Sequence, residues 1–410
     1  MAQHGRLLQV LGAGFSVAVI VGSSVGAGIL RTPGAVVAQV DSLLIAFALW
    51  TVGGLYALLG AAALADLATT IPRSGGFYVY ASRALGRPAG FVVGCADWFS
   101  NTAFIAYGAI ALGEYLTLLG ASHGLALGAA SIVGFTLLQL LGTRLNGRVQ
   151  EVTSFAKAIA FVALIAMLFV AAPAAPSTPT ATTPSALPGF IAIIVALQLV
   201  IGAYDGWQSG LYFAGEDRDP ARNVPRAFIG GVLLVAAVYL LMNAALMRVL
   251  PAQQLAASAL PAADAARLVF GDSGATFITV LSAGSLLPLI FAVLLGSTRI
   301  FYAMAVDGGL PPRLAFVNAG GTPVPALLLS AGMGLLFITT GTFEAIAGVA
   351  AFFAVLSYAG AFVSLLVLRH REPDLPRPFK SWGYPWTTIL VLAGATVMLG
   401  GIVMSAFGGS

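Results

Sequence analysis

The chain has 410 residues, of which 59% are hydrophobic and only 8% are charged, and its formal net charge is +4. Soluble domains carry roughly 25% charged residues, so this composition indicates a polytopic membrane protein and excludes a large soluble core. A small positive charge in such a chain does not point to a nucleic-acid partner. The single cysteine, Cys95, excludes an internal disulfide.

Eleven apolar segments are long enough to be membrane helices, since a bilayer core needs about 20 apolar residues per helix. Met1 to Gln9 is a short polar start, so we expect the first segment to remain as a helix rather than to be cleaved as a signal peptide. The segments run over approximately 9–38, 43–70, 88–119, 122–142, 149–172, 188–214, 226–249, 274–305, 323–341, 343–368 and 386–407.

The first segment is interrupted by small residues. A helix that restarts near Gly28 presents free N–H groups that suit a carboxylate, and a helix that ends near Val21 leaves carbonyls that suit an ammonium group. One broken helix therefore offers complementary ends to a zwitterion. The alternative is that the glycines only permit close helix packing. The interrupted stretch consists of Val21, Gly22, Ser23, Ser24, Val25, Gly26, Ala27, Gly28 and Ile29.

The fifth segment contains Lys157, and a lysine inside a membrane helix is costly and usually functional. It would act as a fixed cation in place of a sodium ion or titrate after burial, or it would extend to the inner surface. Pro225 is expected to start the seventh helix. Asp66, Asp97 and Glu114 are expected near helix ends without a functional role.

The sixth segment carries a second break, and unwound backbone at membrane depth is tolerated only where it is buried in protein or lines a cavity. Segments 1–5 and 6–10 each begin with a broken helix, and an odd number of helices per half makes the repeat inverted. Such paired breaks predict a transporter with its substrate site between them. Arg31, beyond the first break, either contacts substrate or pairs with Asp205. The second break consists of Gly202, Ala203, Tyr204, Asp205, Gly206 and Trp207.

Orientation follows from the Lys and Arg residues near the helix ends, and with a cytoplasmic N-terminus only Arg31, Arg248 and Arg267 fall on the outer side. The uncharged loop 172–187 and the partly helical loop 251–272 are then external, as is the C-terminus. No metal site, cofactor or nucleophile–base constellation is predicted. Sixteen of the 19 basic residues lie on the inner side, at Arg6, Arg73, Arg83, Arg87, Arg144, Arg148, Lys157, Arg218, Arg222, Arg226, Arg299, Arg313, Arg369, Arg371, Arg377 and Lys380.

Six motifs in order resemble those of the amino acid–polyamine–organocation (APC) superfamily, especially the L-type amino acid exchangers and their bacterial relatives. The first, Gly26 to Leu30, is similar to a Gly-Ser-Gly-Ile-Phe signature in the first helix. The others are Asp66 to Gly76; Glu216 with Pro220 and Pro225-Arg226-Ala227; Arg299 to Ala305; Asp307 to Pro311; and Pro376 to Lys380 followed by Trp382 to Pro385.

The resemblance implies the five-plus-five inverted-repeat (LeuT-like) fold, with helices 1 and 6 discontinuous, in one transmembrane domain over 1–410. It also implies sodium-independent exchange of L-amino acids. By the same resemblance, Lys157 matches a lysine of the fifth helix that occupies the place of a sodium ion. Tyr239 matches a tyrosine that links the substrate to that lysine.

Three departures from the family pattern matter. Gly202 stands where the family often has a bulky aromatic gate, and the usual twelfth helix is absent from this sequence. The expected external loop around Ala121 to Gly124 lacks the cysteine through which some exchangers bind a glycoprotein subunit, so we expect no disulfide-linked heavy subunit.

We therefore expect a cytoplasmic-membrane exchanger of small or neutral amino acids that works by alternating access. The two breaks bind the substrate, and Lys157 with Tyr239 couples its binding to movement of the first helix. A proton-coupled symporter, or a carrier of cationic amino acids or polyamines on the same fold, remains an alternative. The sequence leaves the oligomeric state open.

Overall fold

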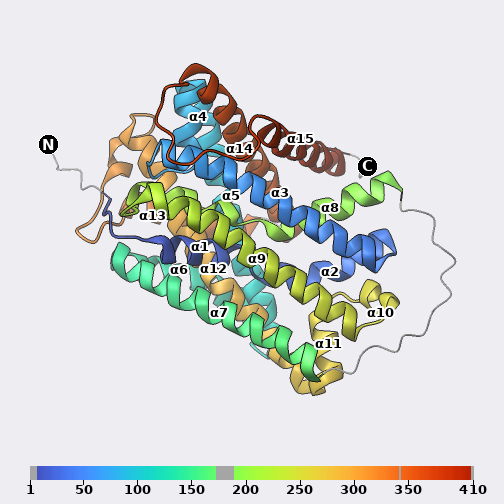
Figure 1. The fold of residues 1–410 in the computed structure, drawn as a ribbon. Coiled ribbons are helices and arrows are strands. Elements are labelled where there is room, and N and C mark those ends of the chain that lie inside the picture. Colours follow the sequence, from blue (N-terminus) through green and yellow to red (C-terminus); the bar gives the residue numbers. More distant parts are fainter. Residues whose placement is uncertain (1–6, 172–188, 341–342, 408–410) are drawn as a thin grey trace.

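The computed structural model describes residues 7–171, 189–340 and 343–407 (Figure 1). In these ranges the chain is helical apart from its connections and one isolated bridge between Leu11 and Asp217. The predicted all-α class is confirmed. The predicted external loop 172–187 lies outside the described residues.

Most of the helices α1 to α15 and the 3-10 helix η1 lie within the predicted segments, whereas α4, α10, α11 and the 3-10 helix η2 lie between them. Each of the eleven segments has a helix or an interrupted helix at its place. The bounds are α1 Ala13–Ser24, α2 Ala27–Val40, α3 Leu43–Thr70, α4 Phe77–Leu85, α5 Arg87–Leu118, α6 Gly124–Gln139, α7 Thr143–Ala171, α8 Phe190–Tyr204, η1 Trp207–Glu216, α9 Pro220–Val249, α10 Ala252–Ala257, α11 Pro261–Phe270, α12 Asp272–Val306, η2 Pro312–Ala315, α13 Val324–Thr340, α14 Phe343–Arg371 and α15 Trp386–Phe407.

Membrane-spanning length is reached by six apolar helices in the described ranges, and by a seventh if α1 and α2, bent by 46°, form one broken span. The helices α6, α13 and α15 are apolar but shorter. With 32 residues α5 is also long, although Asp97, Ser100 and Asn101 interrupt its apolar run. These spans confirm a multi-pass membrane protein.

One predicted boundary is wrong. The helix α9 begins at Pro220, and Pro225 lies inside it. A proline at the first helical position loses no hydrogen bond, because the first four N–H groups of a helix have no partner within it. Pro225 lies just beyond that first turn. It is a second proline in the same helix, and the helix continues past it.

The long helix α12 runs through the molecule and positions much of the interior. It packs against α5, α1, α7 and η1. The helices α3 and α9 pack against each other, and α2 packs against α8. The two interrupted helices therefore meet inside a shell of continuous ones.

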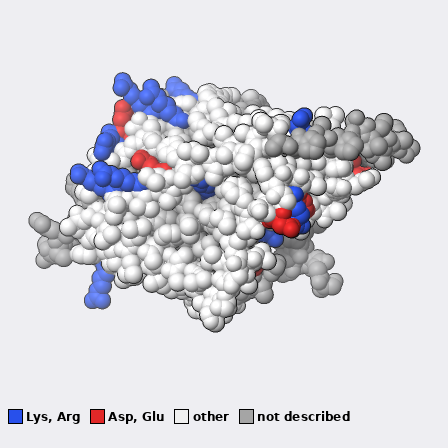
Figure 2. Space-filling model, turned by 90° about the horizontal axis from the view of Figure 1, so that it is seen from below, with Lys and Arg blue, Asp and Glu red and all other residues white. Residues whose placement is uncertain are grey.

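Charged side chains are distributed unevenly over the surface. Figure 2 shows Lys and Arg gathering mainly toward one end, at the left, with a wide uncharged surface beside them and a smaller mixed cluster toward the other end. An uncharged zone between charged ends is the pattern of a protein whose middle faces lipid.

Candidate substrate site

The first break separates α1 from α2. After Ser24, Val25 is extended with ψ 116°, Gly26 follows with φ −169°, and α2 begins at Ala27. No side chain of the described chain caps the N-terminus of α2. Its first N–H groups therefore remain available to an anion, and the helix dipole favours one there.

The second break follows Tyr204, the last residue of α8. Gly206 has φ +113°, which strongly favours glycine. A Cβ atom on Gly206 would lie 2.7 Å from the carbonyl carbon of Ser23 and 2.7 Å from the nitrogen of Ser24. The two breaks are thus in backbone contact, which only a glycine permits.

A cavity of about 280 Å³ opens beside this contact. It is bounded by both breaks and by residues of α3, α5, α12, α14 and α15. Nine of the predicted substrate residues line it: Ser23, Ser24, Gly26, Ala27, Gly28, Gly202, Ala203, Asp205 and Trp207.

Four other predicted residues are not among those lining the cavity. The side chains of Val21, Val25, Ile29 and Tyr204 are buried in the surrounding core. The Tyr204 hydroxyl donates to the carbonyl of Trp50 at 3.1 Å and so joins α8 to α3. These four residues support the breaks, and only their main chains could meet a ligand.

Tyr239 of α9 links the two breaks. Its fully buried hydroxyl lies 2.6 Å from the carbonyl oxygen of Ser24 and 2.8 Å from that of Ala203. A hydroxyl has one proton to donate. Two carbonyls, one from each broken helix, therefore share one donor.

Lys157 of α7 holds the first break from the opposite side. Its ammonium group donates to the carbonyl of Gly22 at 2.7 Å and to that of Ser285 at 3.0 Å. These carbonyls belong to α1 and α12, and the residue is only 5% exposed. The lysine does not extend to the surface; it supplies a buried cation between α1 and α12.

A polar cluster around Asp97 was not predicted from the sequence. This residue does not lie at a helix end but ten residues into α5, and it lines the cavity. Its carboxylate accepts from Tyr212 at 2.7 Å and from Asn101 at 2.9 Å. The sequence did contain a sign of this cluster, an Asp followed four residues later by an Asn within an apolar run. Residues four apart share one face of a helix.

Asp205 has a partner that the sequence did not indicate. Its carboxylate accepts a hydrogen bond from the hydroxyl of Tyr358 on α14, and that ring stacks on Trp207 with centroids 5.4 Å apart. The suggested pair with Arg31 is not present among the ion pairs of the described residues, and Arg31 is exposed. An α14 side chain therefore closes one wall of the cavity.

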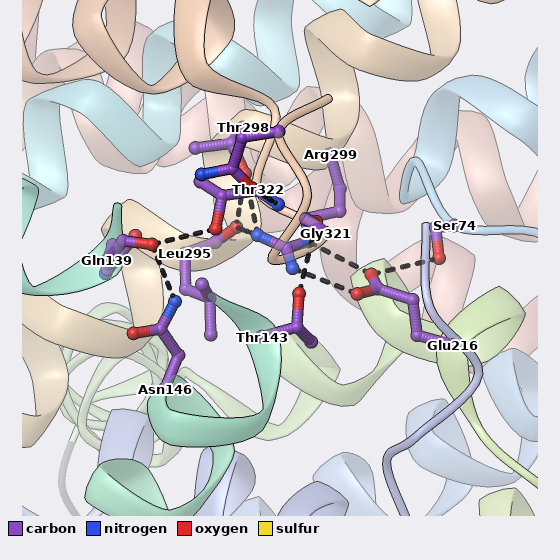
Figure 3. A network of polar contacts seen from close by, with 11 residues as sticks. Ser74, Gln139, Thr143, Asn146, Glu216, Leu295, Thr298, Arg299, Gly321 and Thr322 are labelled. Atoms are coloured by element: carbon purple, nitrogen blue, oxygen red, sulfur yellow. Dashed lines mark hydrogen bonds and ion pairs between the residues drawn. The ribbon is translucent and has the colours of Figure 1, made fainter. Parts of the chain in front are cut away.

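A second buried network fixes the far end of η1. Figure 3 shows the Glu216 carboxylate and the Arg299 guanidinium pointing toward one another, with two contacts of 3.0 Å. Both side chains are fully buried. Ser74 also donates to Glu216 at 3.3 Å, and Arg299 donates to the Leu295 carbonyl and to Thr298. The network ties η1 to α12 and to the connection between α3 and α4.

Several known proteins are similar to this chain. The family described as Amino acid permease matches residues 14–408. The serine/threonine exchanger SteT of Bacillus subtilis is 28% identical, over 98% of this chain and 93% of that protein. The human large neutral amino acids transporter small subunit 2 is 30% identical, over 88% of this chain and 70% of that protein. The mouse b(0,+)-type amino acid transporter 1 is 27% identical, over 89% and 77%.

Proposed function

The chain belongs to the amino acid permease family, and from this premise we propose that it is a sodium-independent exchanger of small or neutral L-amino acids. The family consists of transporters, not enzymes. The observation that carries the proposal is the backbone contact between two broken helices beside one cavity, with the uncapped start of α2 on its wall.

The breaks recognise the part that all amino acids share. The N–H groups at Gly26, Ala27 and Gly28 bind the carboxylate. Carbonyls of Ser24 and Ala203 bind the ammonium group, and Ser23 and Asp205 line the cavity beside them. Because a zwitterion needs both poles at once, this arrangement selects amino acids over simple acids or amines.

Lys157 takes the role that a sodium ion would otherwise fill. It places one positive charge between α1 and α12, bonded to Gly22 and Ser285, so the first break needs no external cation. Tyr239 joins the same break to α8. Together they transmit the occupancy of the site to the position of α1.

The five-plus-five inverted repeat and its orientation belong to the same proposal. We place α1–α7 and α8–α14 as the two halves of one domain over 1–410, with α15 as an added helix. The positive-inside rule puts the basic end of the molecule in the cytoplasm. The protein works without a disulfide-linked heavy subunit, because its single cysteine, Cys95, lies within α5.

Counterflow in proteoliposomes tests the transport mode. Labelled alanine or serine is offered, without sodium, to vesicles preloaded with the same amino acid and to empty vesicles. An exchanger fills only the loaded vesicles. Equal uptake into both contradicts exchange, and further stimulation by an inward proton gradient would identify a proton-coupled symporter.

One observation favours a second candidate substrate class. Two carboxylates, Asp97 and Asp205, line the cavity, whereas none of the described residues lining it is Lys, Arg or His. A buried carboxylate is costly without a proton or a nearby cation. A substrate with a cationic side chain, such as lysine, would supply that cation. Competition against labelled alanine by lysine but not by leucine would select this candidate.

A further inference from the structure

The connection between α14 and α15 encloses a second cavity, away from the substrate site, with a volume of about 530 Å³. This connection, residues 372–385, joins two apolar helices and therefore lies at the membrane surface. The cavity is lined by Arg369, Pro373, Asp374, Leu375, Pro376, Arg377, Lys380 and Tyr384.

Positive charge exceeds negative charge in this cavity. Arg369 and Arg377 both pair with one carboxylate, that of Asp66, which is fully buried. One carboxylate neutralises only one of two guanidinium groups. Lys380 is exposed at the rim. Asp374 also lines the cavity, so a net positive charge remains.

The basic groups are held in place before any ligand arrives. The backbone N–H of Ser381 donates to Asp66 at 2.8 Å, and the Arg369 guanidinium lies over the Tyr384 ring, 4.2 Å from its centroid. The Nε–H of Arg369 is buried and has no hydrogen-bond partner. A buried donor without an acceptor is costly, and a negative charge in the adjacent cavity would lower that cost electrostatically.

Aromatic side chains beside the cavity point to its depth in the membrane. Trp382 is 46% exposed and Trp386 is 76% exposed, and they flank the cavity-lining Tyr384 in sequence. Tryptophan and tyrosine gather at the level of lipid headgroups, where their rings are partly apolar and partly hydrated. Lysine and arginine at that level attract anionic lipids.

We propose that this cavity, defined by Arg369, Arg377, Lys380 and Asp374, binds the headgroup of an anionic phospholipid of the phosphatidylglycerol type. The phosphate accepts from Lys380, and the Arg369 and Arg377 guanidinium groups add positive charge beside it. Asp374 accepts from a headgroup hydroxyl, which explains a carboxylate in a basic site. The bound lipid holds the α14–α15 connection against the membrane and against the end of α3.

Lipid titration of the purified protein in detergent tests the proposal. The midpoint of thermal unfolding is followed while short-chain phosphatidylglycerol, phosphatidylethanolamine or phosphatidylcholine is added. Phosphatidylglycerol should raise the midpoint at lower concentrations than the two zwitterionic lipids. Lys380→Gln should raise the phosphatidylglycerol concentration needed for this stabilisation roughly fivefold. One basic residue near the membrane surface strengthens binding to an anionic lipid by about that factor. Equal effects of all three lipids would overturn the proposal.

Two controls separate this site from its alternatives. Arg313→Gln removes an exposed cation of η2 outside the cavity and should leave the lipid response unchanged. If it weakens the response as much as Lys380→Gln does, the attraction is diffuse and the site is refuted. Glycerol 3-phosphate should not compete with the lipid at similar concentrations. If it does, a soluble phosphate is the ligand and the lipid assignment fails.

Discussion

Replacing Lys157 with methionine tests how the site is coupled to movement. Methionine has a similar length but no charge and no donor. The change removes two hydrogen bonds from a charged group, to Gly22 and Ser285, each worth about 1.5–3 kcal/mol. It also removes the cost of burying an ammonium group, which is several kcal/mol. These terms have opposite signs, so we expect Lys157→Met to remain folded.

The effect on transport should be larger than the effect on folding. If only one conformation of the cycle makes the two bonds, their loss shifts the balance between conformations by at least about 3 kcal/mol, or roughly 100-fold. Counterflow into preloaded proteoliposomes should therefore fall roughly 100-fold. Thr153→Val, one turn earlier on α7, is the matched control and should keep the parent rate.

Two measurements decide whether the reasoning holds. Thermal unfolding of the purified variant must show that it is folded, and counterflow then reports coupling. A folded Lys157→Met protein that exchanges at the parent rate would show that the lysine is structural only. Restoration of its transport by added sodium would instead support the lysine as a substitute for an ion.

Three further outcomes follow from the geometry. Tyr239→Phe leaves both break carbonyls without their shared donor, so it should lower counterflow at least tenfold and cost about 1–3 kcal/mol of unfolding free energy. Glu216→Gln leaves the buried Arg299 charge uncompensated and should cost about 3–5 kcal/mol of unfolding free energy. Adding Arg299→Met should recover most of that loss. An unfolding free energy unchanged by Glu216→Gln alone would contradict this. Arg83 holds the pKa of Glu372 below its ordinary 4.5, so this pair stabilises the fold above that pH and the effect is lost as pH falls through the lower folded value. The pair is partly exposed, so Glu372→Gln should cost only a few tenths of a kcal/mol near pH 7 and nothing near pH 2, as thermal unfolding against pH will show.

The helices and both interruptions were predictable because they depend on local sequence. A membrane helix is an uninterrupted apolar run, and small residues at Gly26 and Gly206 are visible signs of its interruption. Lys157 was recognisable as an unusual charge for the same reason. The direction in which the Lys157 side chain extends could not be predicted, because it depends on which helices lie beside α7.

Contacts between distant segments could not be obtained this way. Tyr358 meets Asp205 across 153 residues, and Arg299 meets Glu216 across 83. No local pattern pairs these residues. Asp97 was misplaced because one acidic residue in an apolar run resembles a helix end when the length of the helix is unknown. The start of α9 was misplaced because two prolines compete for one boundary.

The shared donor at Tyr239 gives a physical reason for exchange. One hydroxyl proton faces the carbonyls of Ser24 and Ala203, so without substrate one carbonyl lacks a full hydrogen bond. An ammonium group has three donors and would satisfy both. In the occluded state that the carrier must cross, water cannot reach this acceptor, and leaving it unsatisfied there costs about 1–3 kcal/mol, which would slow the return of the empty carrier by roughly 5- to 150-fold. A loaded carrier does not bear this cost, so the same contact that binds the amine would favour return with substrate over return without it.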